Sequence, residues 1–194
     1  MPDYDRRVTR SDLVPDPFVT NSCVSVNLRH MIREISAGGV VMRHTPEGWQ
    51  LAVIEPQKES AVPLSDSARQ KTPQKMLLAL PKGLVDRGEK PVQAATREVA
   101  EETGITAIPV TKLGDTKYVY VRSWGDKERV FKIVSFYLFQ YQSGEIDKIA
   151  PEMRIEVKRA LWIALEDAAK KLAYGGEKDM VRRAEAYLKS HPEL

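Results

Sequence analysis

Cysteine is nearly absent from this chain of 194 residues, because Cys23 is the only one. A single cysteine excludes an internal disulfide, so we expect a reducing, cytoplasmic compartment. No apolar run approaches the length of a membrane-spanning helix without charges. The N-terminal stretch MPDYDRRVTRSDLVPDPF also lacks the apolar core of a secretory signal. We therefore expect neither export nor contact with a membrane.

The chain also lacks an excess of charge of one sign. It has 30 basic and 27 acidic residues and a formal net charge of +3, which is too mild to indicate nucleic-acid binding. That balance remains compatible with a polyanionic small molecule. The few histidines, His30, His44 and His191, show neither the spacing of a catalytic triad nor that of a metal site. We interpret them as surface or packing residues.

The length and the 42% hydrophobic content fit one globular domain with a sizeable core. We expect an extension over residues 1–34 and a domain over 35–194, with a long polar loop at 57–75. Strand patterns cover 34–43 and 49–56, as a hairpin across 44–48, then 76–83, an antiparallel pair at 117–124 and 129–141, and 157–165. Helix patterns cover 91–103, 165–174 and 177–190, the first ended by Gly104 and the second by Gly175 and Gly176. Such mixing predicts a layered α/β or α+β fold.

Two of the expected helices carry apolar faces. In the last helix, residues at helical spacing are expected core contacts: Met180, Val181, Ala184, Tyr187 and Leu188. In the first helix, one side can pack through Val92, Thr96, Val99 and Thr103 while another faces a site.

Negative charge is crowded on that first helix. Glu98, Glu101 and Glu102 share one helical face, where like charges weaken a helix by roughly a few tenths of a kcal/mol per pair. Their clustering becomes favourable when a divalent cation lies among them. Mg²⁺ takes oxygen ligands, usually a couple of carboxylates together with waters and substrate phosphates.

These residues belong to a longer pattern, GLVDRGEKPVQAATREVAEETGI, which runs from Gly83 to Ile105. It resembles the complete signature of the Nudix hydrolase family, and the stretches LPKG and AGGVV and the later Trp162 resemble that family too. The resemblance covers about residues 35–190. It implies a mixed β-sheet between helices, with the signature forming loop–helix–loop. It also implies cleavage of a nucleoside diphosphate linked to another group, with Mg²⁺ or Mn²⁺ as cofactor.

The resemblance also implies roles for single residues. Glu98, Glu101, Glu102 and the carbonyl of Gly83 would bind the metal, although Glu98 is alternatively the general base. Arg97 would pair with Glu89 and hold the carboxylates in position. A further acidic ligand often follows the signature, and Glu156 fits best, with Glu152 second. For these two residues, exposed loop charges are an equally good interpretation.

The stretch KYVYVRSWGDKERVFKIVSFYL resembles the branch that hydrolyses diadenosine polyphosphates. Candidates for stacking a base are Tyr118, Tyr120 and Tyr137, and candidates for other substrate contacts are Lys82, Arg129 and Lys132. The alternative for the aromatic residues is sheet packing. Basic residues of the long loop, Lys58, Arg69, Lys71 and Lys75, could reach a polyphosphate or simply keep the loop solvated.

Three functional hypotheses stay open. The first is a hydrolase of dinucleoside polyphosphates. The second is the same chemistry on oxidised nucleoside triphosphates or diphosphoinositol polyphosphates. The third is a non-catalytic Nudix module that senses a nucleotide or binds a partner, against which the intact carboxylate set argues. The expected partner is a nucleotide polyphosphate, and a homodimer is left open.

Overall fold

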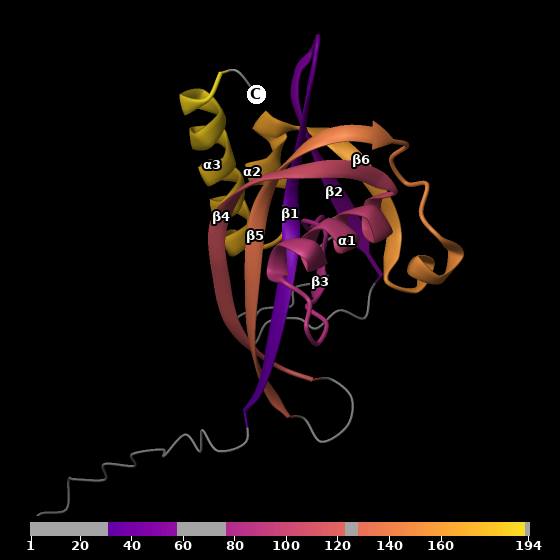
Figure 1. The fold of residues 1–194 in the computed structure, drawn as a ribbon, viewed down its shortest axis with the longest axis vertical. Helices are drawn as coiled ribbons and strands as arrows, with labels where there is room; N and C mark the ends of the chain where they lie inside the picture. The colour runs from indigo at the N-terminus through magenta and orange to yellow at the C-terminus, as the bar shows by residue number, and fades with distance from the viewer. Residues whose placement is uncertain (1–30, 58–76, 123–127, 193–194) are drawn as a thin grey trace, which may run out of the picture.

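The computed structural model describes residues 31–57, 77–122 and 128–192. A six-stranded mixed sheet lies between helices (Figure 1). Its strands are β1 (Ile32–Thr45), β2 (Gly48–Pro56), β3 (Lys82–Leu84), β4 (Ile105–Val121), β5 (Arg129–Gly144) and β6 (Val157–Ala164). The helices are α1 (Pro91–Thr103), α2 (Ala168–Lys171) and α3 (Gly175–Ser190). The layered fold implied by the resemblance is therefore confirmed.

The strand order is β4-β5-β1-β2-β6, and β3 pairs with β1 outside this path. β1 and β5 run parallel, whereas the other paired strands run antiparallel. The ends of β1, β4 and β5 continue past α1 as a projecting arm (Figure 1). Over the three described ranges, no helix is long and apolar enough to cross a membrane.

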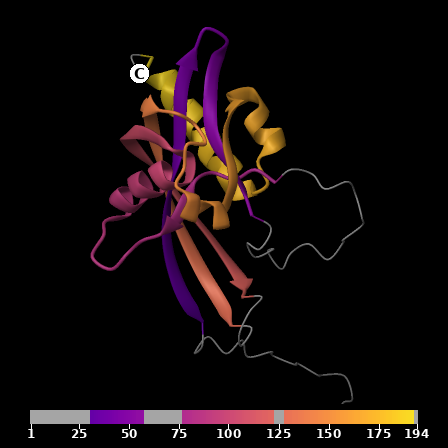
Figure 2. The same cartoon turned by 90° about the vertical axis from the view of Figure 1, so that its right-hand side faces the viewer.

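Side chains that alternate along β5 supply two different cores. Val134, Phe136 and Leu138 are buried in the core that α2 and α3 cover, whereas Tyr137 and Phe139 belong to the core under α1. Successive strand residues point to opposite faces, so one strand can serve both layers. Figure 2 shows the helices on the two sides of the sheet.

Helix α1 begins and ends at the predicted residues. Pro91 is its first residue, where the missing N–H costs no hydrogen bond. Gly104 ends it with φ 77°, a left-handed conformation that glycine adopts without a steric penalty. The buried face is wider than predicted, because Ala94 and Ala95 are also fully buried.

The expected strand at 117–124 is only the second half of β4. The first half was missed because three register shifts between Thr106 and Gly114 break the alternation. Pro109 and Gly114 lie in this stretch, and both residue types are unfavourable in regular strands. The end of the expected strand, from residue 123, lies outside the described residues.

The short strand expected over 76–83 forms only in part. Leu78 and Ala79 make isolated bridges, and the regular pairing is confined to β3. Pro81 separates the two pieces, and proline has no N–H to donate to a ladder. This segment therefore crosses from the α2 side of the molecule to β1.

The helix predicted over 165–174 is shorter in the structure and ends at Lys171. A 3₁₀ turn at Leu165–Asp167 leads into the single turn of α2, and the chain is extended at Leu172. Leu172 is 2% exposed, so burial of its side chain overrides the local helical preference. Gly175 and Gly176 do not end that helix but begin α3.

The start of the domain also differs from the prediction. Ile32, Arg33 and Glu34, which fall in the expected extension 1–34, pair with β5 as the first part of β1. These three residues join the sheet because they pair with a strand that is distant in the sequence, which the local pattern does not indicate. Residues 1–30 and most of the expected loop, from 58 to 76, lie outside the described residues.

Candidate active site

Two carboxylates of α1 are buried against β3. Glu98 is 8% exposed and Glu102 is 5% exposed, whereas the side chain of Glu101 is 42% exposed. Residues four apart share a helix face, which brings Glu98 and Glu102 to the same strand. The backbone N–H of Lys82 donates to Oε2 of Glu102 at 2.7 Å. Two of the three predicted carboxylates, Glu98 and Glu102, therefore point inward onto the backbone of β3, whereas Glu101 stays exposed.

Gly83 makes this close approach feasible. A Cβ at this position would lie 2.1 Å from both Cδ and Oε1 of Glu98, well inside van der Waals contact. Only glycine leaves that space to the carboxylate. The signature glycine and Glu98 therefore form one packed unit.

Arg97 connects four parts of the site. It contacts both oxygens of Glu89 at 3.1 Å, Glu98 at 2.7 Å and Glu101 at 3.0 Å. It also donates to the carbonyl of Leu84 at 2.9 Å. The structure thus contains the expected pair of Arg97 and Glu89, in the two-pronged geometry that suits a guanidinium. The same side chain ties the helix carboxylates to the end of β3.

Burial and like charge act together on the two inner carboxylates. Burial raises the pKa of Glu98, and repulsion from Glu101 and Glu156 raises it further, against the hydrogen bond from Arg97. Burial raises the pKa of Glu102 to about 8, with Lys82 opposing the rise and Glu98 and Glu156 adding to it. Glu156 therefore lies close enough to act on both, although its own side chain is exposed.

The expected set of three metal-binding carboxylates is not assembled in this arrangement. Across residues 31–57, 77–122 and 128–192, no three acidic, histidine or cysteine side chains are placed so that they could hold a metal ion. In this arrangement Arg97 bonds Glu98 and Glu101, while Glu102 accepts the Lys82 amide.

The donor chemistry nevertheless fits Mg²⁺ or Mn²⁺. Two buried carboxylates and a glycine backbone in contact with one of them supply hard oxygen ligands. A cation among them would also offset the repulsion that raises both pKa values.

The candidate substrate residues are divided between the two faces of the sheet. Lys132 lies opposite Tyr118 in the register of β4 and β5, so both side chains point to the α3 face. Arg129 and Tyr137 are an odd number of residues from Lys132 and point to the other face. Tyr137 packs on the core under α1, and this sheet packing is the alternative interpretation of that residue.

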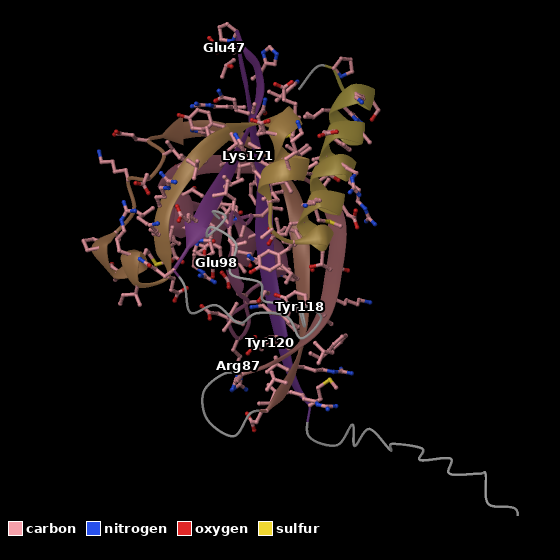
Figure 3. The ribbon with its side chains drawn as sticks, turned by 180° about the vertical axis from the view of Figure 1, so that it is seen from behind. Glu47, Arg87, Glu98, Tyr118, Tyr120 and Lys171 are labelled. Carbon is pink, nitrogen blue, oxygen red and sulfur yellow. The ribbon has the colours of Figure 1, made fainter. Side chains whose placement is uncertain are left out.

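Glu34 of β1 links side chains of β4 and β5 on the α3 face of the arm. This carboxylate accepts hydrogen bonds from Tyr120 and Arg122 at 2.8 Å and lies 3.8 Å from Lys132. Burial lowers the pKa of Lys132, with Glu34 and the site carboxylates opposing the change. Lys132 therefore lies within electrostatic reach of the site. Figure 3 shows Tyr118 and Tyr120 on the arm below Glu98.

Lys82 is committed to protein contacts. Its ammonium lies 3.1 Å from Glu177 of α3 and 5.8 Å from the ring of Tyr174. Burial disfavours its charge, but Glu177 and Glu102 outweigh burial and raise the pKa of Lys82. Sequence reasoning missed Glu34 and Glu177, because their partners Tyr120 and Leu80 come from distant parts of the chain.

Comparison with known proteins agrees with this geometry. The family model described as a NUDIX domain matches residues 48–184, more than half of the chain. The chain belongs to the Nudix family. Its signature helix is α1, and the signature glycine lies in β3.

Two named relatives match parts of this Nudix chain. A candidate mutator protein, MutT4, of Mycobacterium tuberculosis is 35% identical over 111 residues, which are 57% of this chain and 42% of that protein. An 8-oxo-(d)GTP phosphatase of Mycolicibacterium smegmatis is 30% identical over 105 residues, which are 54% of this chain and 29% of that protein. The chain thus spans less than half the length of each relative.

Solved Nudix structures share the fold. An Ap4A hydrolase binary complex from C. elegans has a TM-score of 0.56 and 23% identity, covering 81% of this chain and 98% of that chain. The NUDIX domain of Shewanella oneidensis NrtR, complexed with ADP ribose, has a TM-score of 0.54 and 17% identity. That match covers 82% of this chain and 91% of the other. Identities this low establish a common fold and no more.

Proposed function

We propose that this Nudix protein hydrolyses a phosphoanhydride bond of a nucleoside polyphosphate, with dinucleoside polyphosphates as the substrate class. The observation that carries the proposal is the burial of Glu98 and Glu102 against the backbone of Lys82 and Gly83. Burial raises the pKa of both carboxylates, and titratable side chains perturbed in this way are concentrated at functional sites. A reducing, cytoplasmic setting is part of the proposal and is supported by the single cysteine.

A divalent cation, Mg²⁺ or Mn²⁺, would be held by Glu98, Glu102, Glu101 and the carbonyl of Gly83, with Glu156 as a further acidic neighbour. When bound, such an ion neutralises phosphate charge and lowers the pKa of a water. Glu98 and Glu101 both bond Arg97. If one of these carboxylates turned toward the cation, Arg97 would retain its bonds to Glu89 and to the Leu84 carbonyl. Arg97 therefore orients the set without depending on any single partner.

The reaction itself needs no protein nucleophile. A water oxygen forms a bond to phosphorus, and the bond from that phosphorus to the bridging oxygen breaks, so that a phosphate leaves. The water proton passes to a carboxylate, for which Glu98 is the candidate because its carboxylate lies directly against Gly83. Arg97 holds Glu98 in place through its 2.7 Å contact.

The substrate class is supported by the α3 face of the arm. Tyr118 is 37% exposed there beside Lys132, so an aromatic surface and a cation adjoin the site. A base can stack on the first and a phosphate can bind the second.

A second substrate class, oxidised nucleoside triphosphates, is favoured by a different observation. The relative that is 30% identical is an 8-oxo-(d)GTP phosphatase. Diphosphoinositol polyphosphates have no comparable support here. The non-catalytic alternative is opposed by the buried carboxylates, which a sensing module does not need.

The test is a turnover panel with Mg²⁺ over diadenosine polyphosphates, oxidised GTP, diphosphoinositol polyphosphates and ADP-ribose. We expect hydrolysis of a nucleotide polyphosphate that stops in excess EDTA and returns when Mg²⁺ is restored. Full turnover in EDTA would contradict the metal assignment. Binding of a nucleotide without any turnover would support the sensing module instead.

A further inference from the structure

Helix α3 reaches the active-site strand through one buried carboxylate. Glu177, in the first turn of α3, is 4% exposed. Its Oε2 accepts the backbone N–H of Leu80 at 3.0 Å, and its Oε1 lies 3.1 Å from the ammonium of Lys82. The ammonium also donates to the carbonyl of Leu80 at 3.3 Å. Glu177 and Lys82 therefore hold the chain from Leu80 to Lys82 at three points.

The same stretch supports the catalytic carboxylates on its other side. The backbone N–H of Lys82 donates to Glu102, and the next residue, Gly83, contacts Glu98. Lys82 thus points its side chain to α3 and its amide to α1. A displacement of this peptide would move the hydrogen-bond partner of Glu102 and the surface on which Glu98 rests.

Stability alone is a poor reason for this ion pair. The desolvation of two buried charges often cancels their attraction, so that apolar residues of similar size serve a fold as well. Van der Waals packing of α3 is already supplied by Met180, Val181 and Ala184. What a paired charge adds is a defined position for the peptide between them.

We propose that Glu177 is a positioning residue, which acts through Lys82 to hold the Leu80–Gly83 backbone in register with Glu98 and Glu102. This role rests on the proposed hydrolase function. It also reassigns Lys82, which sequence reasoning took as a substrate contact, to the support of the site. Neither side chain touches the reacting atoms.

The experiment uses the full chain with Glu177→Gln, Lys82→Met, the double variant and Asp179→Asn as a matched control. Asp179 lies in the same part of α3 but is exposed and paired with Arg182. We expect Glu177→Gln and Lys82→Met each to lower kcat roughly ten- to hundredfold. KM should change by no more than about twofold, because ground-state binding is not involved. The control should keep both constants.

The double variant shows whether the two residues act as a unit. A coupled pair predicts that the double variant loses no more activity than the more damaged single variant. Losses that multiply would overturn the proposal. A raised KM with an unchanged kcat in Lys82→Met would assign the ammonium to the substrate, and this too would overturn it.

Amide hydrogen exchange provides a readout that does not depend on activity. The amides of Leu80 and Lys82 should exchange faster in folded Glu177→Gln than in wild type or Asp179→Asn, since their acceptors are Glu177 and the carboxylate that it helps to place. Unchanged exchange would contradict the positioning role. If the wild type hydrolyses no phosphoanhydride, the proposed function fails, and the exchange comparison still decides whether Glu177 fixes this backbone.

Discussion

At the scale of single residues, the site is governed by the conflict between burial and charge. Burial, with a smaller contribution from the repulsion by Glu98, raises the pKa of Glu102 to about 8, although the Lys82 N–H bonds the carboxylate. A neutral side chain of the same shape would remove the repulsion and keep the acceptor for the Lys82 N–H. Folding stability therefore favours a neutral side chain at position 102, whereas the proposed metal binding needs a carboxylate.

The variant Glu102→Gln separates the effect on folding stability from the effect on activity. We expect the variant to fold with an unchanged or slightly higher free energy of unfolding. We expect kcat to fall on the order of a thousandfold, because a carboxylate that would serve the cation is lost. Steady-state kinetics and urea unfolding measure the two effects, with Glu166→Gln on the exposed surface as control. A kcat near the wild-type value would show that Glu102 is not a ligand.

Gly83→Ala tests the contact with Glu98. The new Cβ would lie 2.1 Å from the Glu98 carboxylate, so the end of that side chain would have to move. Because the displaced atoms are the end of a flexible side chain, we expect a loss of only about 1 kcal/mol of folding free energy, the low end of the overpacking range. A displaced Glu98 should lower kcat roughly a hundredfold.

The matched control for that variant is Gly175→Ala, where a Cβ meets no atom within 4 Å. In that helical position alanine should raise stability by up to about 1 kcal/mol and leave kcat unchanged. Equal kinetics in the two variants would contradict the assigned contact.

The residues that sequence reasoning located are those whose placement depends on local spacing. Arg97, Glu98 and Glu102 lie on one helix, so helical periodicity alone brings them together. Glu34 and Glu177 come from distant elements, and their partners depend on strand register and helix docking. Arg129 and Lys132 were grouped together, but strand alternation sends them to opposite faces.

At the scale of elements, the predicted boundaries were correct where a residue such as proline or glycine fixes its own backbone conformation. Proline and glycine delimit α1 because each acts on its own backbone. The same residue types misled elsewhere. Gly175 and Gly176 begin α3, since the chain had already left the helical conformation at Leu172. Half of β4 was missed because its irregular pairing is supported by β5 and not by its own pattern.

The entry into β6 depends on one acidic residue, Asp147, whose φ is 71°. It accepts the N–H of Ala160 at 2.7 Å and contacts Arg154 at 2.8 Å. Burial raises the pKa of Asp147, but the bonds from Arg154 and Ala160 outweigh it and lower the pKa overall. Its stabilising effect is therefore complete above the unfolded-state pKa and disappears as pH falls through the lower folded-state pKa.

Asp147→Asn should accordingly cost about 1 kcal/mol at neutral pH, a modest value because the carboxylate is partly exposed. Asparagine tolerates the left-handed backbone, so the change isolates charge. The difference from wild type should stay constant down to about pH 5 and shrink below about pH 4. Urea unfolding of both proteins across this range measures it. A difference that grows in acid would contradict the assignment.

At the scale of the whole molecule, the sheet separates two tasks. Its α1 face carries the helix with Glu98 and Glu102, and its α3 face carries Tyr118 on the projecting arm (Figure 3). Lys132 lies opposite Tyr118 on that same face. Glu34 links the arm strands on that second face. The short β3 leaves the path of the main sheet and supplies the backbone on which the carboxylates rest. Under the proposed function, a long substrate would reach from the carboxylates at β3 to Lys132 on the α3 face.

This layout predicts how activity depends on substrate length. Each phosphate that reaches a cation on the α3 face gains a charge-assisted bond of about 1.5–3 kcal/mol. Catalytic efficiency should therefore rise from diadenosine tri- to hexaphosphate, and ADP-ribose should be poor. Part of the gain should appear as a lower KM, because contacts that are equal in ground and transition states do not change kcat. Higher salt should weaken the trend only modestly, because the side chain of Lys132 is largely buried and buried charges are screened less than exposed ones.

The decisive comparison is kcat/KM for that series in wild type, Lys132→Ala and Arg129→Ala, at low and moderate salt. Lys132→Ala should flatten the dependence on phosphate number, because its cation lies on the face that the substrate follows. Arg129→Ala removes an equal charge from the opposite face and should leave the slope unchanged. A flat wild-type series, or oxidised GTP as the best substrate, would exclude dinucleoside polyphosphates and leave the hydrolase assignment in place. Equal slopes in the two variants would show that the arm does not bind the phosphate chain.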